Sequence, residues 1–182
     1  PKPNTAVKDQ GIAHGYALRA DQTGEFNIRM GSRSANDPQK HIYKNKDAVS
    51  GAQIIKIAVP ATVKGQPPLL AWKDTIFNQA QEEEKKKGKD VEQTGIAPYL
   101  EKGAIIIVMG NAISKTDKDA LVAEGLTSLG ELTQSLINQV VPEKGVKVVE
   151  CFNSAPGEWV TDLEYQLALD VVTVGDDRQA CQ

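Results

Sequence analysis

Residues Ala104–Asn111 read AIIIVMGN, a short aliphatic run that ends in glycine and asparagine. Three more runs have the same character: Gln53–Pro60 (QIIKIAVP), Val146–Asn153 (VKVVECFN) and Leu169–Asp177 (LDVVTVGDD). Short runs that are rich in Val and Ile and bounded by Gly, Pro, Asn or Asp are typical of buried strands. Because the runs are almost continuously apolar, they predict strands that are covered on both faces, as in a parallel sheet.

Helical segments are expected between the strands. Weaker strand candidates lie at Thr5–Gln10 and Glu25–Gly31, and a helix is expected over Gly11–Gln22 between them. Alternation of strands and helices implies right-handed crossovers. We therefore expect an α/β fold of Rossmann type, a doubly wound parallel sheet in three αβα layers, forming one domain over residues 1–182.

A second helix is expected over Thr127–Val141 (TSLGELTQSLINQVV), whose apolar residues recur at the spacing of one helix face. Ser128, with Glu131 three residues later, predicts its N-terminus.

The segment 65–102 is a charged insertion, longer than a minimal domain of this kind needs. Its centre, Gln81–Lys89 (QEEEKKKGK), is almost wholly charged. Pairs four residues apart, Glu82 with Lys86 and Glu83 with Lys87, would stabilise an exposed helix by a few tenths of a kcal/mol each. We interpret the segment as a solvated surface insertion, with a partner-binding arm as the alternative.

The composition excludes several classes of protein. The chain has 182 residues and a net charge of −3, so it lacks the basic surface of a nucleic-acid-binding protein. Its apolar runs fall short of the roughly 20 residues that span a bilayer, and its start is polar. We expect a cytoplasmic protein with no membrane partner, in which Cys151 and Cys181 are free thiols.

The sequence offers no conventional catalytic or metal-binding cluster. With only His14 and His41 available, a histidine relay or a zinc site is not expected. Asp176-Asp177 is interpreted as a turn or helix cap rather than a metal pair.

The end of the second expected strand carries Gly31-Ser32-Arg33. Ligands of doubly wound sheets bind outside the carboxyl ends of the strands, and an acid at this place would favour NAD. A hydroxyl and a guanidinium instead suit the 2′-phosphate of NADP, and Lys40 can add a second cation. The preceding loop keeps only part of the G-x-G-x-x-G pattern, since it reads Gln10-Gly11-Ile12-Ala13-His14-Gly15.

These pieces follow a recognisable order along the chain: GYALR (15–19), MGSR (30–33), DPQK (37–40), DAVSGAQIIKIAVP (47–60), GAIIIVMGNAIS (103–114), TSLGE (127–131), VKVVECFNSAP (146–156) and DVVTVGDD (170–177). The set resembles the NADP oxidoreductases typified by deazaflavin (coenzyme F-420)-dependent NADP reductases. It is also similar to the cytoplasmic domain of the STEAP-type metalloreductases. The run VVECFNS is the most distinctive part of the match.

The resemblance implies a set of cofactor-binding residues. Those implied to hold the 2′-phosphate are Ser32, Arg33 and Lys40, and those implied at the glycine loop are Gln10, Gly11 and Ile12. At the later strand ends it implies contacts to the riboses and the nicotinamide from Val59, Pro60, Ala61, Asn111, Asn153 and Ala155. Family members usually continue past the point that matches Gln182 with a part that completes the acceptor site and the dimer, so a homodimer is a candidate.

The leading hypothesis is an NADP(H)-dependent oxidoreductase that passes hydride between the nicotinamide and a deazaflavin (coenzyme F-420) or flavin-like acceptor. Hydride transfer needs orientation more than acid–base help, so no catalytic side chain is assigned. The incomplete glycine loop leaves an alternative, a non-catalytic NADP(H)-binding domain that acts as a sensor or subunit. A third hypothesis is a dehydrogenase of the pyrroline-carboxylate reductase or 6-phosphogluconate type, which would need a large helical C-terminal domain.

Overall fold

The computed structural model describes residues 30–31, 42–151 and 173–181 of the chain. The chain divides into two compact units, residues 1–48 and 49–182. In the first unit, strand β1 (Met30–Gly31) pairs in parallel with β2 (Ile42–Tyr43), and the short helix α2 (Asn45–Val49) begins two residues later. β1 matches the end of the strand expected at Glu25–Gly31, whereas β2 was not predicted.

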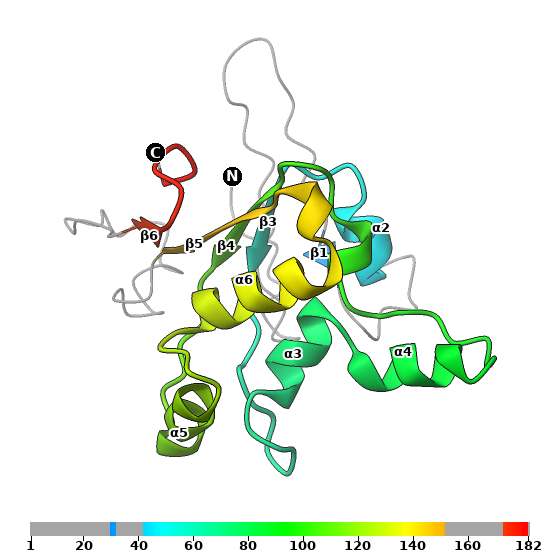
Figure 1. The fold of residues 1–182 in the computed structure, drawn as a ribbon, viewed down its shortest axis with the longest axis horizontal. Coiled ribbons are helices and arrows are strands. Elements are labelled where there is room, and N and C mark those ends of the chain that lie inside the picture. Colours follow the sequence, from blue (N-terminus) through cyan, green and yellow to red (C-terminus); the bar gives the residue numbers. More distant parts are fainter. Residues whose placement is uncertain (1–29, 32–41, 152–172, 182) are drawn as a thin grey trace. The chain divides into compact units, whose positions relative to one another are not determined.

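The second unit contains a four-stranded, mixed sheet in the order β3-β4-β5-β6 (Figure 1). Each of its strands falls inside one of the four apolar runs: β3 (Ile54–Ile57), β4 (Ile105–Val108), β5 (Lys147–Cys151) and β6 (Thr173–Gly175). The first three strands are parallel, with Ile55 opposite Ile106 and Ile106 opposite Val148. The expectation of an α/β fold with parallel strands is therefore confirmed for β3, β4 and β5.

The expectation of a parallel arrangement is wrong for β6, which runs antiparallel to β5. Its first residue, Thr173, lies opposite Cys151, the last residue of β5, so β6 begins at the edge where β5 ends. A parallel partner would have required the chain to return to the opposite edge before pairing. Apolarity carries no information about strand direction, and Val174 is in fact 59% exposed on this outer strand.

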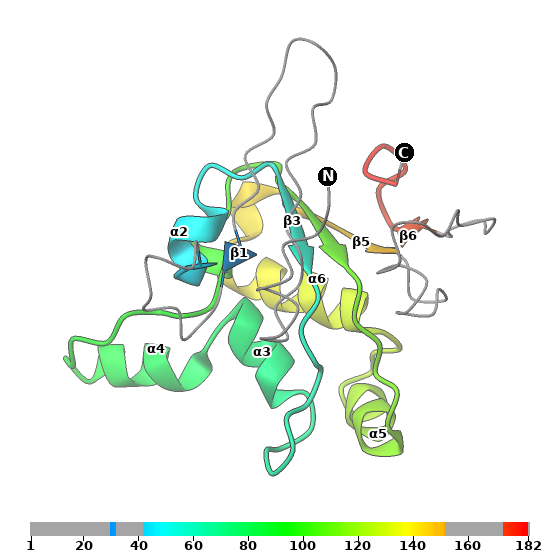
Figure 2. The same cartoon turned by 180° about the vertical axis from the view of Figure 1, so that it is seen from behind.

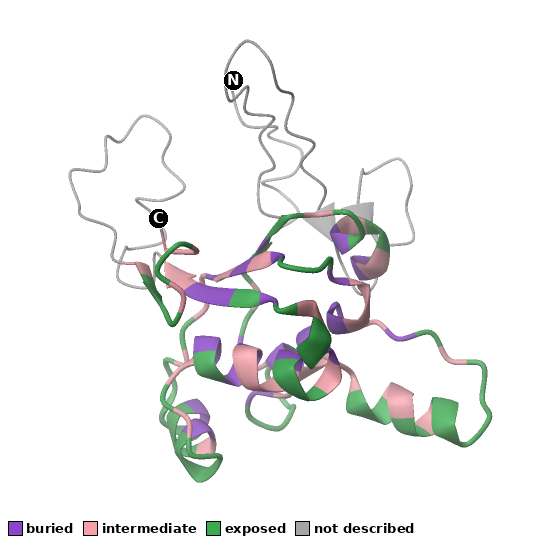
Figure 3. Cartoon of the chain, turned by 45° about the horizontal axis from the view of Figure 1, so that its top comes forward, coloured by how far each residue is buried: buried purple, intermediate pink, exposed green. Residues whose placement is uncertain are grey.

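Two helices, α3 (Leu70–Ile76) and α6 (Leu129–Val140), pack against each other, and α6 also contacts β5. α6 lies in front of the strands in Figure 1 and behind them in Figure 2. The core between helices and sheet is aliphatic, with Trp72 fully buried inside it. Figure 3 shows buried residues along the strands and on α6, and on α3 the buried residues include Trp72 and Ile76. α6 coincides with the helix expected over Thr127–Val141 to within two residues at its start.

The strands were expected to be covered on both faces, and among the described residues β3 is covered on one face only. Ile55 and Ile57 face the helices and are buried, whereas Ile54 is 61% exposed and Lys56 is exposed as well. The alternation shows that residues 42–151 and 173–181 provide no covering layer for the other face of this strand. The helix expected over Gly11–Gln22 lies outside the described residues. Lys56 interrupts the apolar run and lies at a position that faces outward. The apolar character of the run was therefore a poor guide to the burial of both faces.

The long connection from β3 to β4 is only partly a surface insertion. Its first helix, α3, belongs to the core. The segment around η2 (Ala97–Tyr99) is also part of the core, because Ile96, Ala97 and Leu100 are buried there. Between them, α4 (Gln79–Lys86) has no buried residue, which confirms an exposed charged helix. The ion pairs of this helix differ from those expected, because Glu84 pairs with Lys87 and Lys89.

The connection from β4 to β5 holds α5 (Lys115–Ala123), then α6, then the short η3 (Pro142–Lys144). Within the described ranges, no helix has the length and apolarity required to cross a membrane.

Candidate functional site

The carboxyl ends of β3, β4 and β5 form one edge of the sheet, because the three strands run in parallel. The Met109 amide donates to the Ile57 carbonyl across 3.0 Å, which extends the pairing of β3 and β4 to the end of both strands. The loops that follow these two strands therefore start side by side. They carry the predicted residues Val59, Pro60 and Ala61 after β3, and Asn111 after β4.

These four residues differ in what they present at the edge. Pro60 and Asn111 are exposed there. Val59 is half-buried against the core, and Ala61 is only 6% exposed. The Ala61 carbonyl accepts a hydrogen bond from the backbone amide of Trp72. Groups that could meet a ligand at this edge are thus Pro60 and Asn111, while Val59 and Ala61 join the loop to the core.

The other predicted site residues lie outside the described residues. They are Gln10, Gly11, Ile12, Ser32, Arg33, Lys40, Asn153 and Ala155. For these residues the assignment rests on the sequence alone. Gly31, the last residue of β1, directly precedes Ser32, and Cys151, the last residue of β5, comes two residues before Asn153.

Close packing of Trp72 fixes the start of the loop after β4. A Cβ added to Gly110 would lie 2.6 Å from Cζ3 of the Trp72 ring, so glycine is the residue that allows this approach. The indole Nε1–H donates to the Thr133 hydroxyl of α6 across 2.9 Å, and that hydroxyl donates to the Leu129 carbonyl. A buried indole needs such an acceptor. The ring thereby joins α3, α6 and the end of β4.

A polar network joins the two loops at the edge. Thr62 Oγ1, in the loop after β3, donates to Asp117 Oδ1 of α5 across 2.5 Å and accepts from the Leu69 amide across 2.8 Å. Ser114 Oγ, in the loop after β4, donates to Asp117 Oδ2 across 2.7 Å and accepts from the Asp117 amide across 3.0 Å. Asp117 is only 6% exposed. Its carboxylate therefore holds one hydroxyl from each loop.

The N-terminus of α6 also lies on the carboxyl side of the sheet, and groups of the chain occupy it. Ser128 accepts from the Glu131 amide, and the Glu131 carboxylate accepts from the amide and hydroxyl of Thr127. The Thr127 amide is the main cause of the lowered pKa of Glu131. From β5, the Glu150 carboxylate accepts from the Gly130 amide. Free amides at a helix start attract anions, but Glu150 puts a negative charge at this one.

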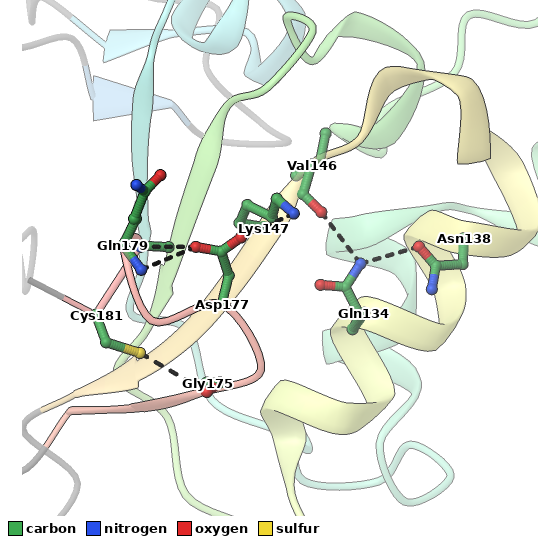
Figure 4. A network of polar contacts seen from close by, with 9 residues as sticks. Gln134, Asn138, Val146, Lys147, Gly175, Asp177, Gln179 and Cys181 are labelled. Atoms are coloured by element: carbon green, nitrogen blue, oxygen red, sulfur yellow. Dashed lines mark hydrogen bonds and ion pairs between the residues drawn. The ribbon is translucent and has the colours of Figure 1, made fainter.

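The outer strand ends in a capped turn (Figure 4). Asp177 Oδ1 accepts from the amides of Gln179 and Ala180, both at 3.0 Å, and Oδ2 pairs with Lys147 at 2.9 Å. The hydrogen bond from Lys147 is the main cause of the lowered pKa of Asp177. The interpretation of Asp176-Asp177 as a turn is thus confirmed. Cys151 and Cys181 are free and half-buried.

The network at Asp117 was missed by sequence reasoning. Ser114 with Asp117 three residues later matches the capping-box pattern and could have been found by it. Nothing in the sequence links Thr62 to Asp117, since the two are 55 residues apart. In the parts of the chain that the structure describes, no group of His, Cys, Asp and Glu is arranged to hold a metal ion.

Comparison of the chain with family models, curated proteins and solved structures finds no match.

Proposed function

We propose that the chain is an NADP(H)-dependent oxidoreductase with a Rossmann-type fold, which passes hydride between the nicotinamide and a deazaflavin or flavin-like acceptor. One observation carries the proposal: Pro60 and Asn111 follow neighbouring parallel strands and are exposed at the same carboxyl edge. In open α/β sheets, ligands bind in the crevice outside this edge.

The N-terminus of α6 is an unfavourable place for the phosphates of the cofactor, because a carboxylate of the chain already lies there. Because Glu150 already accepts from the Gly130 amide, a pyrophosphate at that helix would meet a carboxylate instead of free amides. In the proposed complex the pyrophosphate is held by the loop Gln10–Ile12, as the family resemblance implies. Ser32, Arg33 and Lys40 hold the 2′-phosphate, since a guanidinium fork and a hydroxyl suit a phosphate dianion.

For hydride transfer, the main task of the chain is to orient the nicotinamide and the acceptor. The nicotinamide carries the hydride, and the protein supplies placement and exclusion of water. Pro60 gives a rigid apolar surface and Asn111 an amide that can hydrogen-bond a ribose or a carboxamide. Asn153 and Ala155 are proposed to line the place where the cofactor and the acceptor meet.

The test is titration of the chain with NADPH and with NADH, followed by nicotinamide fluorescence and then by addition of a flavin or a deazaflavin. We expect tight binding of NADPH and oxidation of NADPH when the acceptor is added. Binding without turnover with either acceptor would instead identify a non-catalytic NADP(H)-binding domain. Failure to bind either dinucleotide would overturn the proposal.

A matched pair of variants tests the edge itself. Asn111→Ala should raise the dissociation constant for NADPH, because it removes an amide from the carboxyl edge. Asn138→Ala is the control, since Asn138 is also exposed but bonds Gln134 near the opposite edge, where β5 begins (Figure 4). Equal effects of the two variants would place the ligand away from Asn111.

A further inference from the structure

We propose that Asp117 is a positioning residue for dinucleotide binding, which it serves by fastening the loop after β3 to the loop after β4 through Thr62 and Ser114. This inference rests on the proposed function. It adds Asp117, Thr62 and Ser114, none of which is among the proposed contact residues. These three side chains together are named the Asp117 latch.

The Asp117 latch does more than begin a helix. Ser114 Oγ accepts from the Asp117 amide, which already caps α5. The Asp117 carboxylate could remain in solvent without loss of that bond, yet it is 6% exposed and reaches the Thr62 hydroxyl of another loop at 2.5 Å. A buried carboxylate is retained only where donors satisfy it. The two hydroxyls and its place in the first turn of α5 supply that stabilisation.

The Asp117 latch also supports a strained residue. Leu69 has a φ of 61°, and no other non-glycine residue has positive φ in the described parts of the chain. A left-handed conformation is unfavourable for a bulky side chain, and it persists where its surroundings hold it in place. The Leu69 amide donates to the same Thr62 hydroxyl that donates to Asp117. One chain of hydrogen bonds therefore runs from the start of α3 to the start of α5.

The Asp117 latch lies close in sequence to the residues that are exposed at the carboxyl edge of β3 and β4. Thr62 is two residues after Pro60, and Ser114 is three residues after Asn111. The exposed groups proposed to meet the ligand are thus each a few residues from one end of the latch. Without it, the two loops could separate, and a ligand that contacts both would have to order them on binding. Pre-organised loops spare a ligand that entropic cost.

The experiment compares Thr62→Val with Thr62→Ser. Val keeps the shape of Thr but loses the hydroxyl, whereas Ser keeps the hydroxyl. We expect Thr62→Val to raise the dissociation constants for NADPH and NADH by the same factor, about three- to tenfold, because either dinucleotide would then have to order the two loops on binding. Equal factors are expected because Thr62 is not among the residues proposed to hold the 2′-phosphate. Thr62→Ser should restore wild-type binding.

The control is Gln134→Ala, which removes a hydrogen bond from α6 to the Val146 carbonyl at the opposite edge of the same sheet. It should lower the urea midpoint without changing either dissociation constant at a temperature where every variant is folded. A Thr62→Val variant that loses stability but binds both dinucleotides like the wild type would overturn the positioning role alone. A wild-type chain that binds neither dinucleotide would overturn the proposed function, and with it this role.

Discussion

The helices α5 and α6 begin with nearly the same four-residue pattern and use it differently. Ser114 and Asp117 open α5, and Ser128 and Glu131 open α6, so each helix has a serine cap and an acid three residues on. Glu131 stays exposed and turns back to Thr127 of its own segment. Asp117 is buried, and besides Ser114 it holds Thr62, a residue outside its own helix.

The difference shows how side-chain length divides local from tertiary roles. Glutamate can fold back over the start of its own helix, as the capping box requires. Aspartate is one methylene shorter, and at α5 both its oxygens are taken by hydroxyls instead. At α6 the connection to the sheet comes from a different acid, Glu150 of β5. The same sequence pattern therefore has a local role at α6, where it caps the helix. At α5 it also joins the helix to the loop after β3.

The largest expected effect separates the two acids directly. Asp117→Ala should lower the free energy of unfolding by about 1.5–3 kcal/mol, because the hydroxyls of Thr62 and Ser114 lose their charged acceptor, which is itself buried. Glu131→Ala should cost less than about 1 kcal/mol, because its partners at Thr127 are exposed to water. Urea denaturation of both variants measures the difference. If the two variants cost the same, the burial of Asp117 would be energetically unimportant and the comparison would fail.

The effect of a substitution at Gly130 should be smaller and should depend on the residue at position 150. Gly130→Ala places a Cβ about 2.5 Å from Cγ of Glu150, so it should displace that side chain and be close to neutral or destabilising. In the background Glu150→Ala, the same change should stabilise α6 by about 1 kcal/mol, because alanine is the better helix former. A double-mutant cycle in urea measures this coupling. No coupling between the two positions would mean that Glu150 does not hold the start of α6.

The smallest effect concerns pH. The lowered pKa of Glu131 means that its contribution is fully present above the ordinary value of 4.5 and is lost as the pH falls through the lower, folded value. The stability difference between wild type and Glu131→Gln should therefore shrink as the pH drops below 4.5. Urea midpoints measured between neutral and acid pH test this. A difference that stays constant with pH would show that Glu131 is not bound to Thr127 in solution.

The sequence predicted local elements better than their surroundings. All four apolar runs contain a strand, and the serine cap of α6 lies where the pattern put it. The direction of β6 and the open face of β3 were not predicted. Both depend on which segment lies next to a strand, and the apolarity of a run such as VVTV does not indicate the direction in which the strand runs. The burial of α3 was not predicted either, because its sequence LAWKDTI mixes charged and apolar residues.

The candidate site was predictable in part. Pro60 and Asn111 were implied by the family resemblance, and the parallel pairing of β3 and β4 places the loops that carry them at one edge. Thr62 could not be found, because its partner Asp117 is distant in the sequence and a lone threonine in a loop has no pattern. Ser32 and Arg33 lie outside the described residues, so their role stays a prediction.

Binding of NADP(H) with recognition of the 2′-phosphate can be measured as the ratio of the dissociation constants for NADH and NADPH in wild type and Arg33→Ala. We predict that the wild type prefers NADPH. Arg33→Ala should weaken the binding of NADPH by about 1.5–3 kcal/mol, roughly 10- to 150-fold, and leave the binding of NADH almost unchanged. A wild-type ratio near one, or an equal loss for both dinucleotides, would contradict the account.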